Sequence, residues 1–282
     1  AIKRRVPTVA TIHHPITVDR DLAIRSVRSY WKKQKHLRWH SFLRMQRIVS
    51  RTFSHIITVS KSARNDIGQD FKIPLKRFRV VPNGINTDQF YPLPGIQREK
   101  NRLIVTNSAD IPLKGLYYLL QAVADLSLEY SLKLVVIGTP KKNGGIEKKI
   151  QELNIGHLIK FTGRIDHAEF VRQYAKASIA VIPSLYEGFG IPAGEAMACG
   201  VPVISTTGGA LPEVVGDAGA LVPPADSQAM GKAIQNLMEN PDHALRLGQK
   251  GYERIQNQFT WKRAAEKTVA CYREAIYDHH RF

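Results

Sequence analysis

The order of hydrophobic and polar residues predicts alternating strands and helices over residues 101–258. Leu132–Ile137 is a continuous apolar run, which is typical of a strand buried on both faces of a parallel sheet. Apolar residues spaced by three and four predict one buried helix face, made of Leu116, Leu119, Leu120 and Val123. This alternation predicts an α/β fold with a doubly wound, Rossmann-like lobe.

The same patterns place the remaining elements of this lobe. Further strands are predicted over residues 103–106, 158–162, 178–182 and 201–205. Helices are predicted over residues 146–153, 167–176, 192–199, 226–239, 242–256 and 260–278. We expect the C-terminal helix, within residues 259–282, to pack back toward the N-terminal part of the chain.

Residues 1–88 contain fewer elements. Strands are predicted over residues 9–12, 55–59 and 78–81, with a basic helical stretch over 20–51 and a second helix over 61–69. We interpret this part as the C-terminal half of a second Rossmann-like lobe, joined by a Pro-containing linker over residues 89–100 to the lobe at 101–258. The chain begins without Met and almost directly on a strand, so we expect it to be part of a longer protein.

The composition excludes several classes of protein. The chain of 282 residues is 43% hydrophobic and 23% charged, which is ordinary for a globular protein. No apolar run approaches the ~20 residues that a membrane-spanning helix needs. Cys199 and Cys271 are the only cysteines, too few for a disulfide framework or a cysteine zinc site. We therefore expect a reducing, cytoplasmic location.

The net charge of +17 is concentrated near the N-terminus. Residues 20–51 carry ten Lys and Arg and a single acid, Asp21. Large apolar side chains are interleaved with them, namely Tyr30, Trp31, Trp39 and Phe42. The stretch is either a solvated helix whose aromatic residues enter the core, or a peripheral contact with an anionic membrane at its inner face. Nucleic acid is the weakest interpretation, because no nucleic-acid-binding motif is present.

The segment Pro183–Gly200 carries the clearest chemical signal. It follows a predicted buried strand, and open α/β sheets bind ligands at the carboxyl ends of their strands. Gly188 and Gly190 allow the backbone to approach a ligand closely. Pro192 suits the start of a helix, whose N-terminus would favour a phosphate group. Glu187 in the loop and Glu195 in the predicted first turn of the helix are the candidate acidic residues.

The spacing of Glu187 and Glu195 within Glu-Gly-Phe-Gly…Glu-Ala-Met-Ala resembles the EX7E signature of retaining GT-B glycosyltransferases of family 4. The segments Thr207-Gly208-Gly209 and Val81-Pro82-Asn83-Gly84 are also similar to that family, and the likeness covers residues 50–260. The resemblance implies two Rossmann-like lobes, a nucleotide-sugar donor and no further cofactor. It makes Glu187 the catalytic residue that contacts the donor sugar and Glu195 the ligand of the ribose hydroxyls.

The resemblance also implies further donor-binding residues: Lys114, Gly188, Phe189, Gly190 and Ile191. The family usually places an Arg after the strand at 103–106, where this chain has Thr106-Asn107-Ser108. Ser108 is a candidate donor contact in that segment. Arg164 either replaces the absent cation or lies in a loop near the base. His13, more than His14, matches the active-site His that family members often carry after a strand of the first lobe.

These observations predict a hexosyltransferase-like enzyme that moves a sugar from a nucleotide diphosphate to a carbohydrate or lipid-linked acceptor. We expect no metal, since Asp19-Arg20-Asp21 is better explained as acids capping a helix than as a metal motif. Two alternatives stay open. One is a degenerate nucleotide-sugar-binding or membrane-docking scaffold, and the other is a GT-B epimerase or phosphorylase. The base, the sugar and the acceptor are not indicated by the sequence.

Overall fold

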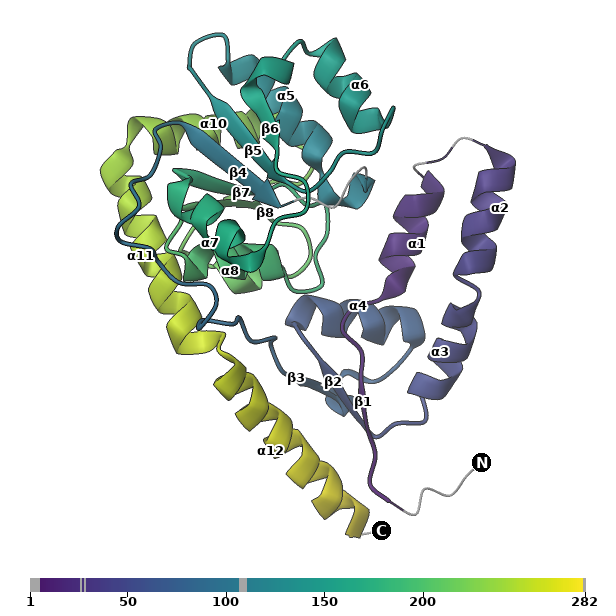
Figure 1. Cartoon of the computed structure of the whole chain (residues 1–282). Coiled ribbons are helices and arrows are strands. Elements are labelled where there is room, and N and C mark those ends of the chain that lie inside the picture. Colours follow the sequence, from purple (N-terminus) through teal and green to yellow (C-terminus); the bar gives the residue numbers. More distant parts are fainter. Residues whose placement is uncertain (1–5, 26, 28, 107–110, 281–282) are drawn as a thin grey trace. The chain divides into compact units, whose positions relative to one another are not determined.

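The computed structural model describes residues 6–25, 27, 29–106 and 111–280. The chain forms two compact units. The first unit comprises Ala1–Gly84 and Trp261–Phe282, and the second comprises Ile85–Thr260 (Figure 1).

The first unit is built on a parallel sheet of three strands in the order β1-β2-β3. These strands are β1 (Val9–Thr11), β2 (His55–Thr58) and β3 (Phe78–Val80). The central strand β2 is buried along its whole length. Helix α4 (Lys61–Phe71) follows β2, and the Ser60 hydroxyl caps it by accepting a hydrogen bond from the Ala63 amide at 3.0 Å.

The basic stretch forms three helices instead of the single one expected. They are α1 (Ile16–Arg25), α2 (Tyr30–Trp39) and α3 (Phe42–Ser50). His40 separates α2 from α3: its ring is buried, and its Nδ1 lies 2.7 Å from the carbonyl oxygen of His36. Asp19 and Asp21 lie inside α1, so the expectation that they precede a helix and cap it was wrong.

The C-terminal helix α12 (Trp261–His280) packs on this three-stranded sheet. Ala264 and Cys271 join Ile57 and Val81 in one buried cluster. Two polar contacts also hold the helix: Arg79 Nε donates to Glu274 at 2.7 Å, and His55 Nε2 lies 3.1 Å from Asp278. Helix α12 is therefore part of the first unit, although it is the last element of the chain.

The second unit contains a six-stranded parallel sheet in the order β6-β5-β4-β7-β8-β9. Its strands are β4 (Arg102–Thr106), β5 (Lys133–Ile137), β6 (Ile159–Phe161), β7 (Ile179–Ile182), β8 (Val203–Thr206) and β9 (Ala220–Val222). From β4 the chain adds β5 and β6 toward one edge of the sheet, and from β7 it adds β8 and β9 toward the other edge. This confirms the doubly wound α/β fold, with its topological switch point between β4 and β7.

Seven helices of the described chain belong to this unit. They are α5 (Leu116–Leu126), α6 (Gly145–Glu152), α7 (His167–Lys176), α8 (Ile191–Ala198), α9 (Leu211–Val215), α10 (Ser227–Glu239) and α11 (Pro241–Gln258). The predicted helix face of Leu116, Leu119, Leu120 and Val123 is at most 2% exposed, as expected. The short elements α9 and β9 were not predicted, because neither is long enough to show a period.

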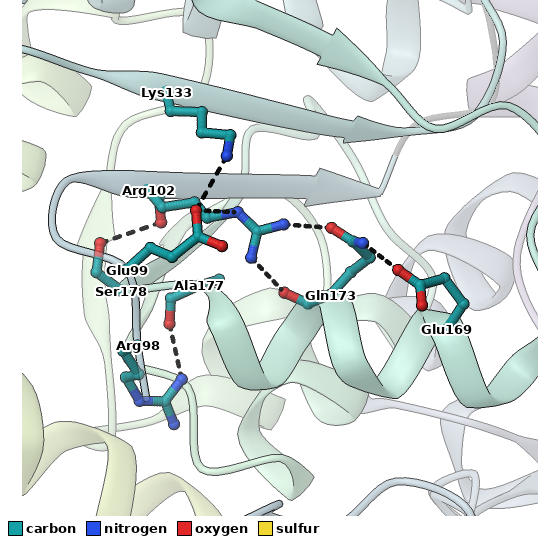
Figure 2. Close-up of polar contacts among 8 residues, drawn as sticks. All are labelled: Arg98, Glu99, Arg102, Lys133, Glu169, Gln173, Ala177 and Ser178. Atoms are coloured by element: carbon teal, nitrogen blue, oxygen red, sulfur yellow. Dashed lines mark hydrogen bonds and ion pairs between the residues drawn. The ribbon is translucent and has the colours of Figure 1, made fainter. Parts of the chain in front are cut away.

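A polar network closes the amino ends of the central strands, a region that we call the amino edge (Figure 2). Arg102, at the start of β4, is only 3% exposed and donates to the Gln173 carbonyl at 3.3 Å and to the Gln173 side chain. Glu99 pairs with Lys133 Nζ at 3.0 Å. Arg98 donates to the carbonyl oxygen of Ala177 at 2.7 Å. The linker before β4 is thereby fixed to the sheet.

None of the helices in the described part of the chain is both long enough and apolar enough to cross a bilayer.

Candidate active site

The candidate site lies at the opposite, carboxyl edge of the same sheet. We use "carboxyl edge" for the segments that follow β4, β5, β6 and β7. The segment after β4 supplies Lys114, and the segment after β7 supplies Glu187 and helix α8. These two segments flank the switch point, where the diverging connections of a doubly wound sheet leave a crevice for a ligand.

Glycine allows the segment around Lys114 to lie directly against the loop after β7. Gly115 has a φ of +66°, and a Cβ atom built there would lie 1.9 Å from the carbonyl oxygen of Pro183. The Leu185 amide donates to the Leu113 carbonyl at 2.8 Å, which joins the two segments. Any side chain at position 115 would push them apart.

A second close approach fixes the backbone of Glu187. Gly209 has a φ of +64°, and a Cβ atom there would lie 2.3 Å from the Glu187 carbonyl oxygen. That carbonyl accepts a hydrogen bond from the Ala210 amide at 2.8 Å. The Thr207-Gly208-Gly209 segment noted in the sequence therefore supports the loop that carries Glu187.

The structure brings the side chains of Glu187 and Lys114 together. Lys114 Nζ lies 2.8 Å from Glu187 Oε1, and the Ser184 hydroxyl donates to the same oxygen at 2.7 Å. The Glu187 side chain is 13% exposed and that of Lys114 is 26% exposed. This ion pair is partly shielded from solvent, yet both partners remain within reach of a ligand.

Helix α8 begins at Ile191, one residue earlier than predicted, with Gly190 as its N-cap at a φ of +100°. The Ala193 and Gly194 amides donate to the Gly190 carbonyl at 3.1 and 3.2 Å, and Pro192 has no amide hydrogen, so Ile191 carries the first amide of the helix that lacks an intrahelical acceptor. The helix dipole places partial positive charge at this end. The Phe189 side chain is buried against Phe259, with ring centroids 5.8 Å apart, so this residue offers the site only its backbone. Ile191 is 45% exposed.

Glu195 lies in the second turn of α8, not in the first turn as expected. Burial raises the pKa of its carboxyl group to about 7. Among the described residues, no side chain or backbone group forms a hydrogen bond or ion pair with this carboxylate. A ligand that donates hydrogen bonds to this half-buried carboxylate would therefore stabilise its charged form.

A cavity of about 460 Å³ opens at the carboxyl edge. Residues from the ends of three strands and from the two flanking segments line it, namely Thr106, Lys114, Gly138, Thr139, Gly163, Arg164 and Pro192. Arg164 therefore lies at the same cavity as Lys114 and the N-terminus of α8. The sequence did not single out Thr106 or Thr139, although Thr106 ends β4 and Thr139 lies two residues after the end of β5, on the ligand-binding edge.

Of the residues predicted to form the site, Lys114 and Arg164 line this cavity, whereas Glu187, Glu195 and the segment 188–191 do not. Ser108 lies outside the described residues. His13 belongs to the first unit, where it is exposed just after β1. The carboxyl ends of β1 and β2 meet at one edge of their sheet, and His13 lies at that edge.

One group of potential metal ligands was found in the described part of the chain. It consists of His55, Glu274 and Asp278 in the first unit. Arg79 occupies both oxygens of Glu274, and His55 faces Asp278. These contacts explain the cluster as an attachment of α12 to the sheet.

A doubly wound sheet with a cationic, helix-capped crevice at its switch point defines a nucleotide- or phosphate-binding α/β protein. The family model of glycosyl transferases group 1 matches residues 94–254, and that of glycosyltransferase family 4 matches residues 1–89. The chain belongs to the family 4 glycosyltransferases of the GT-B fold class.

Similar proteins agree with this assignment. The chain is 41% identical, over 97% of its length and 67% of the relative, to the MMP α-(1→4)-mannosyltransferase of Mycolicibacterium hassiacum. It is 30% identical to the D-inositol 3-phosphate glycosyltransferase of Kineococcus radiotolerans, over 71% of this chain and 52% of the relative. The chain thus spans between about half and two thirds of the length of these relatives.

A solved structure gives the same picture. Sucrose-phosphate synthase from Thermosynechococcus elongatus aligns with a TM-score of 0.78 and 27% identity, over 96% of this chain and 68% of the other.

Proposed function

We propose that the protein to which this chain belongs transfers a sugar from a nucleotide-diphosphate donor to a carbohydrate acceptor, with retention of anomeric configuration. The observation that carries the proposal is the pairing of Lys114 with Glu187 at the switch point, beside the N-terminus of α8. It puts a cation and a carboxylate beside the positive end of a helix dipole.

The diphosphate would lie between Lys114 and the N-terminus of α8. As the bond between the anomeric carbon and the phosphate oxygen breaks, negative charge grows on the departing diphosphate. Lys114 and the amides around Ile191 stabilise this charge without first having to reorient. Arg164, at the same cavity, supplies a second cation in place of the arginine that this chain lacks after β4.

The two carboxylates bind different parts of the donor. Glu187 contacts the donor sugar, because Ser184 and Lys114 hold its carboxylate directly beside Lys114, which lines the cavity. Glu195 accepts hydrogen bonds from the ribose hydroxyls, which compensate for the burial of its charge. The backbone of Gly188, Phe189 and Gly190 approaches the sugar and diphosphate.

We propose a front-face reaction. The acceptor oxygen attacks the anomeric carbon on the face from which the diphosphate leaves, and the acceptor proton passes to the departing phosphate oxygen. This route needs no protein nucleophile. His13, at the strand edge of the first unit, would act on the acceptor side.

The relative at 41% identity is named an α-(1→4)-mannosyltransferase, which favours mannose as the transferred sugar. With an α-linked donor, an α-linked product corresponds to retention. The named relatives are transferases, which makes a degenerate scaffold, an epimerase or a phosphorylase less favoured.

The first unit supports a cytoplasmic protein that binds an anionic membrane surface peripherally. Helix α2 has no buried residue among those described, and Trp31 and Trp39 are 80% and 76% exposed. On α3, Met45 and Ile48 are also exposed beside Arg44 and Arg47. Exposed aromatic and basic side chains on one helix suit lipid headgroups and the interface beneath them. Of the two interpretations left open by the sequence, entry of the aromatic residues into the core does not hold, because Tyr30, Trp31 and Trp39 are at least 66% exposed and Phe42 is 38% exposed.

The function is tested by incubating the full-length protein with mannose-labelled nucleotide donors and acceptor saccharides. The proposal predicts an elongated saccharide with an α linkage by NMR. Free sugar phosphate would indicate phosphorolysis, an isomerised donor would indicate epimerisation, and no turnover would favour the scaffold. Salt-sensitive binding to vesicles with anionic lipid, lost in Trp31→Ala with Trp39→Ala, tests the membrane contact. Equal binding to neutral vesicles would contradict the electrostatic part.

A further inference from the structure

Tyr174 is a buried tyrosine whose hydroxyl contacts two residues that line the cavity of the candidate site. It lies on α7 and is only 2% exposed. Its ring packs against Phe170, with centroids 5.1 Å apart, and against Phe90 at 6.3 Å. A phenylalanine would satisfy this packing equally well, so the ring alone does not account for the hydroxyl. Burying a hydroxyl costs free energy unless it finds a hydrogen-bond partner.

The hydroxyl contacts both sides of the switch point. It lies 3.0 Å from Thr106 Oγ1, at the end of β4, and 3.5 Å from the carbonyl oxygen of Pro192, in the first turn of α8. Both Thr106 and Pro192 line the cavity that also contains Lys114. One buried atom thus links two walls of the ligand cavity without lining it.

The distances favour the hydrogen bond between Tyr174 and Thr106, in which either hydroxyl can be the donor. A separation of 3.0 Å between two hydroxyl oxygens is at the long end of a normal hydrogen bond, and 3.5 Å to a carbonyl is longer still. When Tyr174 donates to Thr106, the threonine's own hydrogen is left for another acceptor. Burial, together with the nearby charge of Glu195, raises the pKa of Tyr174, which keeps this donor protonated.

We propose that Tyr174 is a positioning residue that holds the Thr106 hydroxyl as a hydrogen-bond donor to an oxygen of the bound diphosphate. Thr106 then supplements Lys114 at the strand end where the chain has no arginine. The hydrogen bonds run from Tyr174 to Thr106 and from Thr106 to the ligand, so each strengthens the other. This inference rests on the proposed nucleotide-sugar site and adds two residues to it.

The test is a double-mutant cycle. Binding of UDP, GDP and ADP is measured by calorimetry for the wild type, Tyr174→Phe, Thr106→Val and the double variant. Each single substitution should weaken binding about tenfold, since it removes or misdirects a hydrogen bond to a charged acceptor. The double variant should be little worse than either single variant. Thr106→Ser should restore affinity to within about twofold, because it keeps the hydroxyl.

Controls separate this role from a structural one. Tyr130→Phe removes another tyrosine hydroxyl, one that pairs with Glu239 and Gln235 on α10, and should leave binding unchanged. A lower melting temperature in Tyr174→Phe with unaltered affinity, or additive losses in the double variant, would overturn the inference while sparing the site. If the wild type binds none of the three nucleotides, the proposed function fails and the inference fails with it.

Discussion

The two edges of the six-stranded sheet use charged residues in opposite ways. At the amino edge, Arg102 is buried and bonded to Gln173, and Glu99 is paired with Lys133 (Figure 2). At the carboxyl edge, Lys114 and Arg164 line an open cavity. Both edges belong to the same parallel strands, which begin at the amino edge and end at the carboxyl edge. The amino edge therefore stabilises the fold, and the carboxyl edge keeps its charges within reach of a ligand.

The carboxyl groups at the two edges also differ in whether neighbouring charges compensate for their burial. Burial acts to raise the pKa of Glu99, but the hydrogen bond from Lys133 and the charge of Arg102 lower it overall. Burial raises the pKa of Glu195 to about 7 without such compensation. Ionising a buried carboxyl group that has no hydrogen-bond donor costs free energy, and a ligand that donates hydrogen bonds offsets this cost. Groups with pKa values shifted in this way concentrate at functional sites.

The largest effect should come from Glu187→Gln. The variant keeps an oxygen for Ser184 and Lys114 but loses the charge that faces the sugar. We expect the transfer rate of the full-length protein to fall by about 10²–10³-fold, as for the loss of one preorganised electrostatic group, while nucleotide affinity changes little. Glu99→Gln, at the amino edge, should transfer at the wild-type rate. Wild-type turnover in Glu187→Gln would remove this residue from the mechanism.

The reverse pattern is expected for Arg102→Met. The substitution removes the buried donor of both Gln173 oxygens and one of the two cations that pair with Glu99, so the free energy of unfolding should fall by about 2–3 kcal/mol in urea titrations. The folded variant should bind nucleotide as the wild type does. Lys133→Met, which removes a half-exposed partner of Glu99, should cost much less. Unchanged stability in Arg102→Met would show that the network is incidental.

A smaller effect concerns pH. The ribose hydroxyls favour the charged form of Glu195, and with a pKa of about 7 this form is a minority at pH 6 and a majority at pH 8. Nucleotide affinity should therefore rise about tenfold over this range. The nucleotide's phosphate ionises as well, so Glu195→Gln supplies the reference and should show a weaker rise. Parallel pH profiles for the two proteins would contradict the ribose assignment.

The sequence predicted those features that depend on the residues of a single segment. The helix face around Leu119 and the strand at Leu132–Ile137 follow from local periodicity, and the loop at Glu187 follows from its motif. The break between α2 and α3 falls at His40, whose ring is buried only in the folded chain. The contribution of Thr106 depends on Tyr174, which is distant in sequence. Neither could be derived from local patterns.

We propose that Lys114, at the carboxyl edge of the second unit, binds the diphosphate of a nucleotide sugar. Lys250 forms an exposed ion pair with Asp217 at 2.7 Å in the same unit and provides a matched control. Calorimetric titration of UDP, GDP and ADP should show binding of at least one nucleotide to the wild type and to Lys250→Met. The same nucleotide should bind Lys114→Met about 10–100-fold more weakly. Equal affinity of Lys114→Met and Lys250→Met would contradict the claim.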